Sequence, residues 1–164
     1  MRYAPRIAAA AALFLIPFAA MATEAPASEA PAVAPDPSVE CLANYTQEGS
    51  FFRGRSMKTS ARLPGASQNT AYSRVYGSMA RRGYQIESSE REAGVISASQ
   101  PVSMSEKKVP INIVVTPEGD SDSAIIVSVN LPGGLSTSKE AVQKELCSII
   151  ADAAGTPAPP SAAN

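Results

Sequence analysis

Five segments of the chain alternate apolar and polar side chains, at residues 55–63, 84–88, 94–99, 109–116 and 123–131. A period of two is typical of strands that bury one face and expose the other. Links rich in Gly, Pro, Asp and Ser separate several of these segments, and links of this composition form turns. The sequence therefore predicts an antiparallel sheet of about five strands.

Two other segments repeat their apolar residues with the period of a helix. The first, 67–83, can be capped at its start by Ser67 or Asn69 and ends in Gly83, a residue that readily takes the left-handed conformation that ends a helix. Its predicted apolar stripe comprises Tyr72, Val75, Tyr76, Met79 and Ala80.

The second helix follows a chain reversal at 132–134 and opens with Thr137-x-x-Glu140, the pattern of a capping box. Its predicted inner face comprises Val142, Leu146, Ile149, Ile150 and Ala153, with Cys147 at the margin. The order strand, helix, four strands, helix predicts a single α+β domain with both helices packed on one face of the sheet.

A charged corner, Glu87 to Glu92, joins the second and third predicted strands. Paired carboxylates act as acid and base only where burial or neighbours move their pKa values apart. A solvated hairpin tip provides neither. We therefore interpret Glu87, Glu90, Arg91 and Glu92 as part of a turn and not as a catalytic site.

Residues 1–22 have the layout of a secretory signal peptide, with Arg2 and Arg6 ahead of an apolar run that closes with Ala20-Met21-Ala22. A membrane anchor is the alternative, but a spanning helix needs about 20 apolar residues. This run is shorter and contains Pro17. We expect a periplasmic or secreted protein that does not span the membrane once the signal is cleaved.

Two segments rich in Ala and Pro, 23–38 and 154–164, carry almost no large apolar side chains. Such segments cannot bury enough surface to offset chain entropy, so we predict a disordered spacer and a disordered tail. Between them lies a domain predicted to span 39–153, a length that suits one small fold.

The two cysteines, Cys41 and Cys147, stand too far apart for a redox CxxC motif. In an oxidising compartment two lone cysteines usually pair, and free thiols are the alternative. A bond between them would join the start of the domain to its last helix.

The composition excludes several classes of chemistry. The chain has no histidine, which removes Ser-His-Asp and Cys-His nucleophiles and every His-based metal site. The turn 117–122 has too few oxygen ligands at the spacing of a calcium loop. Lys/Arg and Asp/Glu nearly balance over 51–153, which disfavours a nucleic-acid binder. We expect a protein that is not an enzyme and uses no cofactor.

The pattern Ala71-Tyr72-x-x-Val75-Tyr76-x-x-Met79, with Gly83-Tyr84-x-Ile86 and Glu92-Ala93-Gly94-Val95-Ile96-x-Ala98 after it, resembles the helix-grip domains of bacterial envelope proteins such as BamC-type lipoproteins. The resemblance covers 55–153 and implies a fold and a compartment. It implies no partner and no catalytic residue. The chain departs from those lipoproteins because no lipidated cysteine follows the signal.

Our first functional hypothesis is a binding module for an envelope protein or polymer. Its candidate surface is basic and comprises Arg53, Arg55, Lys58 and Arg62, although an ordinary solvated face is the simpler interpretation. Phe51-Phe52 precedes it, and we expect this pair to pack under the segment that the disulfide holds. An exposed interface anchor is the alternative.

The second hypothesis is a carrier of a small apolar ligand such as a lipid. A helix-grip fold can leave a cavity between its sheet and its long helix, and apolar cavities with few polar groups suit such ligands. The core side chains are of medium size, so we expect the space to be filled. If a cavity exists, Tyr72, Tyr76 and Tyr84 are the predicted polar contacts.

Overall fold

The computed structural model describes residues 36–103 and 106–155, all within the unit Val33–Asn164. The predicted signal peptide and most of the predicted spacer and tail lie outside the described residues. So does the predicted cleavage site.

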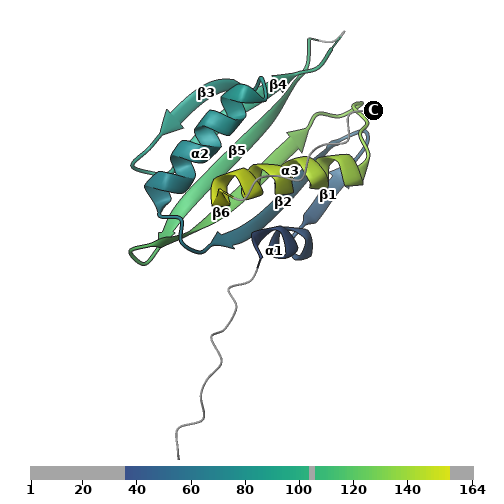
Figure 1. Ribbon diagram of the computed structural model, residues 1–164. Coiled ribbons are helices and arrows are strands. Elements are labelled where there is room, and N and C mark those ends of the chain that lie inside the picture. The colour runs from purple at the N-terminus through teal and green to yellow at the C-terminus, as the bar shows by residue number, and fades with distance from the viewer. Residues whose placement is uncertain (1–35, 104–105, 156–164) are drawn as a thin grey trace, which may run out of the picture. The chain divides into compact units, whose positions relative to one another are not determined.

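Six antiparallel strands form one sheet in the order β1-β2-β6-β5-β4-β3 (Figure 1). The strands are β1 Thr46–Ser50, β2 Gly54–Leu63, β3 Gln85–Glu90, β4 Val95–Pro101, β5 Lys108–Glu118 and β6 Asp122–Leu131. Pairing of β3 with β4 shifts register between Ile86 and Ser88, which marks a bulge in the edge strand. The predicted α+β fold with an antiparallel sheet is confirmed, with one strand more than predicted.

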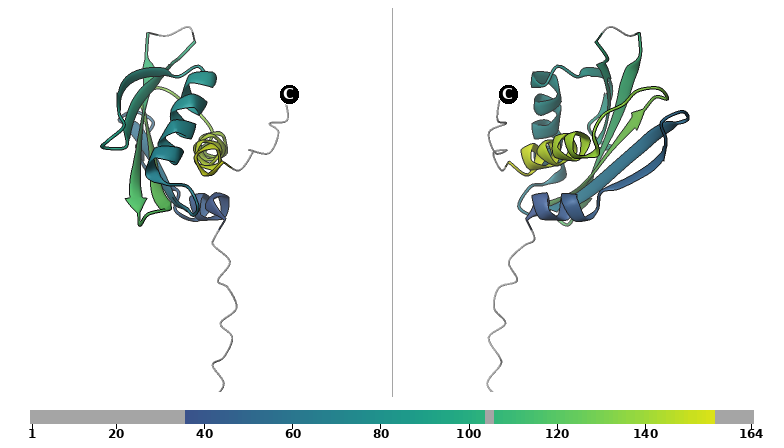
Figure 2. Two further views of the ribbon diagram at one scale, coloured as in Figure 1. Left: turned by 60° about the vertical axis from the view of Figure 1, so that its left-hand side comes forward. Right: turned by 90° about the vertical axis from the view of Figure 1, so that its right-hand side faces the viewer.

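Three helices cover one face of the sheet, and within residues 36–103 and 106–155 no helix lies on its other face (Figure 2). They are α1 Pro37–Ala43, α2 Gln68–Arg81 and α3 Lys139–Ala154. Helix α2 runs along the strands, whereas α3 lies across them (Figure 1). A long helix held across a curved antiparallel sheet is the helix-grip arrangement.

The core lies between this sheet and the helices. Rows of inward side chains continue from strand to strand, so that Met57 lies opposite Val129 and Val129 lies opposite Ile111. Helix α3 closes the core with Leu146 and Ile149, both fully buried. Full burial of such a side chain contributes about 1.5–3 kcal/mol. Because this gain favours apolar residues at every inward position, the spacing of apolar residues in the sequence predicted these strands and helices.

Helix α2 turns its buried face partly towards α3, which differs from the prediction. Tyr76 is 41% exposed and Ala80 is exposed, whereas Ala71 and Ser78 are buried. The reason is that α2 packs against both the sheet and α3, so its contact face is wider than an apolar stripe indicates. Its end is as predicted, because Gly83 has φ of +81° and the Tyr84 amide donates to the carbonyl of Met79.

Two details at the ends of α3 also differ from the prediction. The N-cap is Ser138, whose hydroxyl accepts from the amide of Ala141, and not Thr137. The carbonyl of Thr137 accepts instead from Arg55. The helix extends to Ala154, one residue beyond the predicted domain end.

Helix α1 and strand β1 were absent from the prediction because neither carries an amphipathic pattern. Val39 and Leu42 of α1 are exposed, and Cys41 is its buried side chain. Every residue of β1 is exposed. The helix begins at Pro37, two residues before the predicted start of the domain, and Asp36 caps it by accepting from the amide of Ser38.

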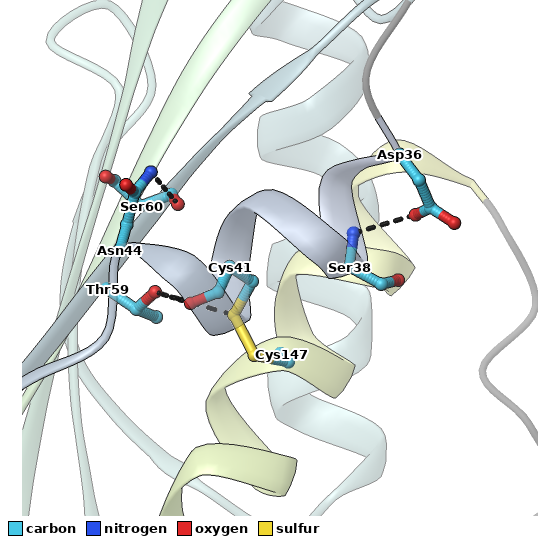
Figure 3. The surroundings of a disulfide bond; sticks show 7 residues. All are labelled: Asp36, Ser38, Cys41, Asn44, Thr59, Ser60 and Cys147. Atoms are coloured by element: carbon cyan, nitrogen blue, oxygen red, sulfur yellow. Dashed lines mark hydrogen bonds between the residues drawn. A yellow bond between two sulfur atoms is a disulfide. The ribbon is translucent and has the colours of Figure 1, made fainter.

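A disulfide joins α1 to α3, as predicted. It links Cys41 to Cys147 across a Cα–Cα distance of 5.7 Å (Figure 3). The hydroxyl of Thr59 on β2 donates to the carbonyl of Cys41 at 2.6 Å. The bond and this contact hold a helix of seven residues that is too short to be stable alone.

Candidate functional site: an apolar pocket under helix α3

The four predicted basic residues do not form one surface. Arg55 shares the helix-covered face with Met57, and its Nη2 donates to the Thr137 carbonyl at 3.5 Å. Lys58 and Arg62 lie on the opposite face, because neighbouring strand residues point to opposite sides. Arg53 lies in the turn that joins β1 to β2.

The expectation that Phe51 and Phe52 pack under the disulfide-held segment is wrong. Phe51 is 46% exposed and Phe52 is 87% exposed. The reason lies in the register: Thr46 pairs with Lys58, so the rest of the β1–β2 hairpin extends past the part of β2 that α1 contacts. The exposure of both rings agrees with the alternative, an exposed interface anchor.

The charged corner at the β3–β4 hairpin is solvated, and its four charged side chains are exposed. Only Arg91 and Glu92 lie in the turn, because β3 extends two residues further than predicted and includes Glu87 and Glu90. Arg91 leans back onto α2, where it donates to the Ser73 hydroxyl at 2.8 Å and lies 5.1 Å from the ring centroid of Tyr72. This contact holds the turn against the helix and brings no acid–base pair together.

A pocket of about 300 Å³ lies between α3 and the sheet. Strands β2, β4, β5 and β6 form one wall, and α3 with the loop that precedes it forms the other. Ten apolar side chains line it: Met57, Val102, Val109, Ile111, Val129, Leu131, Leu135, Ala141, Val142 and Leu146. The prediction that side chains fill this space is therefore wrong.

The pocket has a closed inner end and an open outer end. At the inner end Met57, Ile111 and Leu146 are almost fully buried. At the outer end Val102 and Leu135 are partly exposed and belong to the loops after β4 and β6. Access is therefore from the end of the sheet where these loops lie, which we call the loop end.

Two polar groups, Tyr84 and Glu145, stand on the α2 side of the pocket. The Tyr84 hydroxyl donates to Glu145 Oε1 at 3.3 Å. Burial raises the pKa of Tyr84, and the charge of Glu145 raises it further, so the phenol stays neutral and can act as donor or acceptor. Of the three predicted tyrosines only Tyr84 lines the pocket. Glu145 escaped the sequence analysis because nothing in the spacing of α3 distinguishes it from a solvated acid.

Arg82 holds this polar edge in place. Its guanidinium pairs with Glu145 at 3.1 Å and with Asp152 at 2.8 Å, and it also donates to Ser148. Burial lowers the pKa of Arg82, but the hydrogen bond to Asp152 and the charge of Glu145 outweigh that effect and raise it. The network ties the end of α2 to α3 and fixes the Glu145 carboxylate beside the pocket.

Over residues 36–103 and 106–155, no group of three or more His, Cys, Asp or Glu side chains is arranged to hold a metal ion. None of the helices in those ranges is long and apolar enough to cross a membrane. Glu118 and Asp122 of the turn considered for calcium have other contacts, since Glu118 lies 3.7 Å from Arg62 and Asp122 accepts from the Gly65 amide.

No protein-family model and no curated protein matches the chain. Among solved structures, a conserved protein of unknown function from Enterococcus faecalis, EF2215, aligns with a TM-score of 0.47 at 10% identity, over 77% of this chain and 86% of that one. CalU16 from Micromonospora echinospora aligns with a TM-score of 0.44 at 13% identity, over 68% and 80% of the two chains. Ara h 8.0201 aligns with a TM-score of 0.35 at 15% identity, over 72% and 77%. Such values assign neither a family nor an activity. Of the resemblance inferred from the sequence, the part that is confirmed is the helix-grip arrangement, which the fold itself shows.

Proposed function

We propose that this protein binds a small, largely apolar ligand in the pocket under α3 and acts as a carrier or sensor of that ligand, without catalysis. The observation that carries the proposal is the pocket itself. Small-molecule sites are concave and mostly apolar, with a few polar groups that fix orientation, and this half-open space of about 300 Å³ between sheet and helix has that character.

The size and lining of the pocket indicate the ligand class. A cavity of about 150 Å³ accommodates benzene, so this pocket suits a ligand of about a dozen non-hydrogen atoms or the end of a longer acyl chain. At about 0.3 kcal/mol per atom such a ligand would gain about 3.6 kcal/mol and bind with a Kd of about 2 mM, and a closely fitting ligand would reach the micromolar range. A ligand with one hydroxyl or amine near Tyr84 and Glu145 would satisfy both polar groups.

The first hypothesis from the sequence, a binding module for an envelope protein or polymer, is the second candidate. One observation supports it: the exposed pair Phe51 and Phe52, since aromatic side chains of this kind are common in interfaces. The predicted basic surface supports it less, because its residues lie on different faces. An exported location is compatible with the disulfide and remains part of the proposal.

Fluorescence of N-phenyl-1-naphthylamine, a neutral apolar probe, tests the pocket. We expect saturable binding to the purified protein. Val142→Phe places a ring at the pocket wall and should weaken probe binding at least tenfold. Lys144→Phe places the same ring at an exposed position of α3 that does not line the pocket, and should leave binding unchanged.

Native mass spectrometry of the purified protein provides a second measurement. A bound small molecule that the Val142→Phe variant lacks would identify the ligand. Equal probe affinity in the wild type and the Val142→Phe variant, with both folded by circular dichroism, would overturn the proposal.

A further inference from the structure

The β1–β2 hairpin presents two aromatic rings to solvent at the loop end. Phe52 is the most exposed large apolar side chain among the described residues, and its ring meets that of Phe51 edge-on at 5.3 Å. Exposed apolar side chains of this size are common at sites that contact a partner or a membrane.

The hairpin tip is braced and does not hang free. The carbonyl of Phe51 accepts from the amide of Gly134 at 2.8 Å, so the tip is hydrogen-bonded to the loop between β6 and α3. Lys107 Nζ donates to the carbonyl of Gly133 at 2.8 Å and links the same loop to the start of β5. The hairpin tip and the loop after β6 thus lie side by side at the loop end (Figure 2, right), and Lys107 joins the start of β5 to this platform.

Positive charge accompanies the rings at this end. Arg53 is exposed directly after Phe52, and Lys107 and Lys108 are exposed at the start of β5. Two exposed acids, Glu48 and Glu106, also lie at this end, so its charge is mixed with an excess of bases. The opposite end of the sheet, at the β3–β4 and β5–β6 hairpins, carries two bases, Arg62 and Arg91, and a larger number of acids: Glu87, Glu90, Glu92, Glu118, Asp120 and Asp122. The domain is thus polarised, with its exposed rings at the basic end.

We propose that the loop end, defined by Phe51, Phe52, Arg53, Lys107 and Lys108, docks on an anionic lipid surface. Aromatic and aliphatic side chains that enter the headgroup region give area-dependent binding, and nearby Lys and Arg side chains add attraction to anionic lipids. The acid-rich end points away from the lipid in this orientation, so the difference in charge between the two ends favours it.

A second copy of the chain suits this surface less well. Two copies joined through the loop end would bring Arg53 and Lys108 of each close to the same cations of the other, and like charges repel. Two phenyl rings also offer much less area than the roughly 1,200 Å² or more that a stable interface buries.

Docking at the loop end would also bring the pocket to the lipid. Val102 and Leu135, at the open end of the pocket, belong to the loops that form the platform. An apolar molecule could then pass between the bilayer and the pocket without crossing water. This consequence rests on the proposed function, whereas docking itself does not.

Co-sedimentation with vesicles tests the proposal. We expect the protein to bind vesicles of phosphatidylcholine with phosphatidylglycerol, and to bind phosphatidylcholine alone much more weakly. Added salt should release it, since screening weakens exposed charge interactions. Phe52→Ala should lower partitioning roughly tenfold, the ratio expected for an apolar side chain of this size. Arg53→Glu with Lys108→Glu should abolish binding.

Leu42→Ala is the matched control, because Leu42 is 54% exposed on α1, away from the loop end. It should bind vesicles as the wild type does. Failure of the wild type to bind anionic vesicles, or equal losses in Leu42→Ala and Phe52→Ala, would overturn the proposal. So would a dimer in sedimentation that Phe52→Ala dissociates, which would assign the rings to self-association.

Probe binding to Phe52→Ala in lipid-free buffer separates the two proposals. Unchanged probe affinity together with lost vesicle binding is the result expected if both proposals hold. Vesicle binding without any probe binding would refute the pocket and leave docking intact.

Discussion

Reduction of the Cys41–Cys147 disulfide should lower the free energy of unfolding by several kcal/mol. The two residues are 106 positions apart, and the chain-entropy treatment gives about 4.7 kcal/mol for closing a loop of that length in the unfolded chain. Total stability of a domain of this size is about 5–15 kcal/mol. The bond is therefore expected to supply a large share of it.

Urea unfolding followed by circular dichroism measures this effect, since the chain contains no tryptophan to report by fluorescence. With an m-value of about 2 kcal/mol/M, the midpoint should fall by about 2 M on addition of reductant. The native spectrum should stay the same, because Thr59 still donates to the Cys41 carbonyl and the Arg62 amide still donates to Glu40. The m-value should rise slightly as the unlinked chain exposes more surface.

The Cys41→Ala/Cys147→Ala variant separates the bond from the sulfur atoms. Cys41 is fully buried, so its truncation adds a packing loss of about 1 kcal/mol to the entropic term. The variant should therefore be slightly less stable than the reduced wild type. If the oxidised and reduced wild-type proteins unfold at the same urea concentration within error, the argument that the disulfide stabilises the fold by restricting the unfolded chain is refuted.

Two further predictions concern backbone strain and a buried phenol. Gly94→Ala should destabilise the fold by more than about 3 kcal/mol in the same urea assay, because its φ is +70° and its new Cβ would overlap the carbonyl oxygen of Val115. Gly65→Ala is the control, since Gly65 has φ of +72° with open space around it, and it should cost only about 1–2 kcal/mol; equal losses would contradict the steric argument. Tyr84 should ionise above the usual pH of a tyrosine in an ultraviolet titration, because burial and the charge of Glu145 raise its pKa, and Glu145→Gln should lower that pKa. Because the unfolded chain loses this proton first, near pH 10, stability should fall as pH rises above that value, and a fall that is the same in Tyr84→Phe would exclude Tyr84 as its cause.

Elements with one buried and one exposed face could be predicted from the sequence. Strand β2 shows this well, since every second residue from Met57 to Leu63 is buried and the residues between them are more exposed. The same holds for the end of α2, where Gly83 closes the helix. In these segments the spacing of apolar residues matches the burial of the side chains in the fold, so the segment's own sequence is enough to predict its structure.

Strand β1 and the pocket could not be predicted, because both depend on contacts between segments that are far apart in the sequence. Strand β1 pairs along one edge and buries no side chain, so only its hydrogen bonds to β2 define it. The pocket depends on how far α3 stands from the sheet. The disulfide at Cys147 ties α3 to α1 and the network around Arg82 ties it to the end of α2, and both join segments far apart in sequence. No pattern within α3 itself predicts how far the helix stands from the sheet.

The bulge between Ile86 and Ser88 has a consequence for how the protein behaves at high concentration. An open sheet has two edges whose unpaired amides and carbonyls can recruit a strand from another molecule, and this is a common route to aggregation. Here β3 is interrupted by the bulge and exposes Glu87 and Glu90, while β1 has only five residues and exposes Glu48. Both edges are thus poor templates for strand addition, so we expect the sheet to stay six-stranded and not to extend into a second molecule.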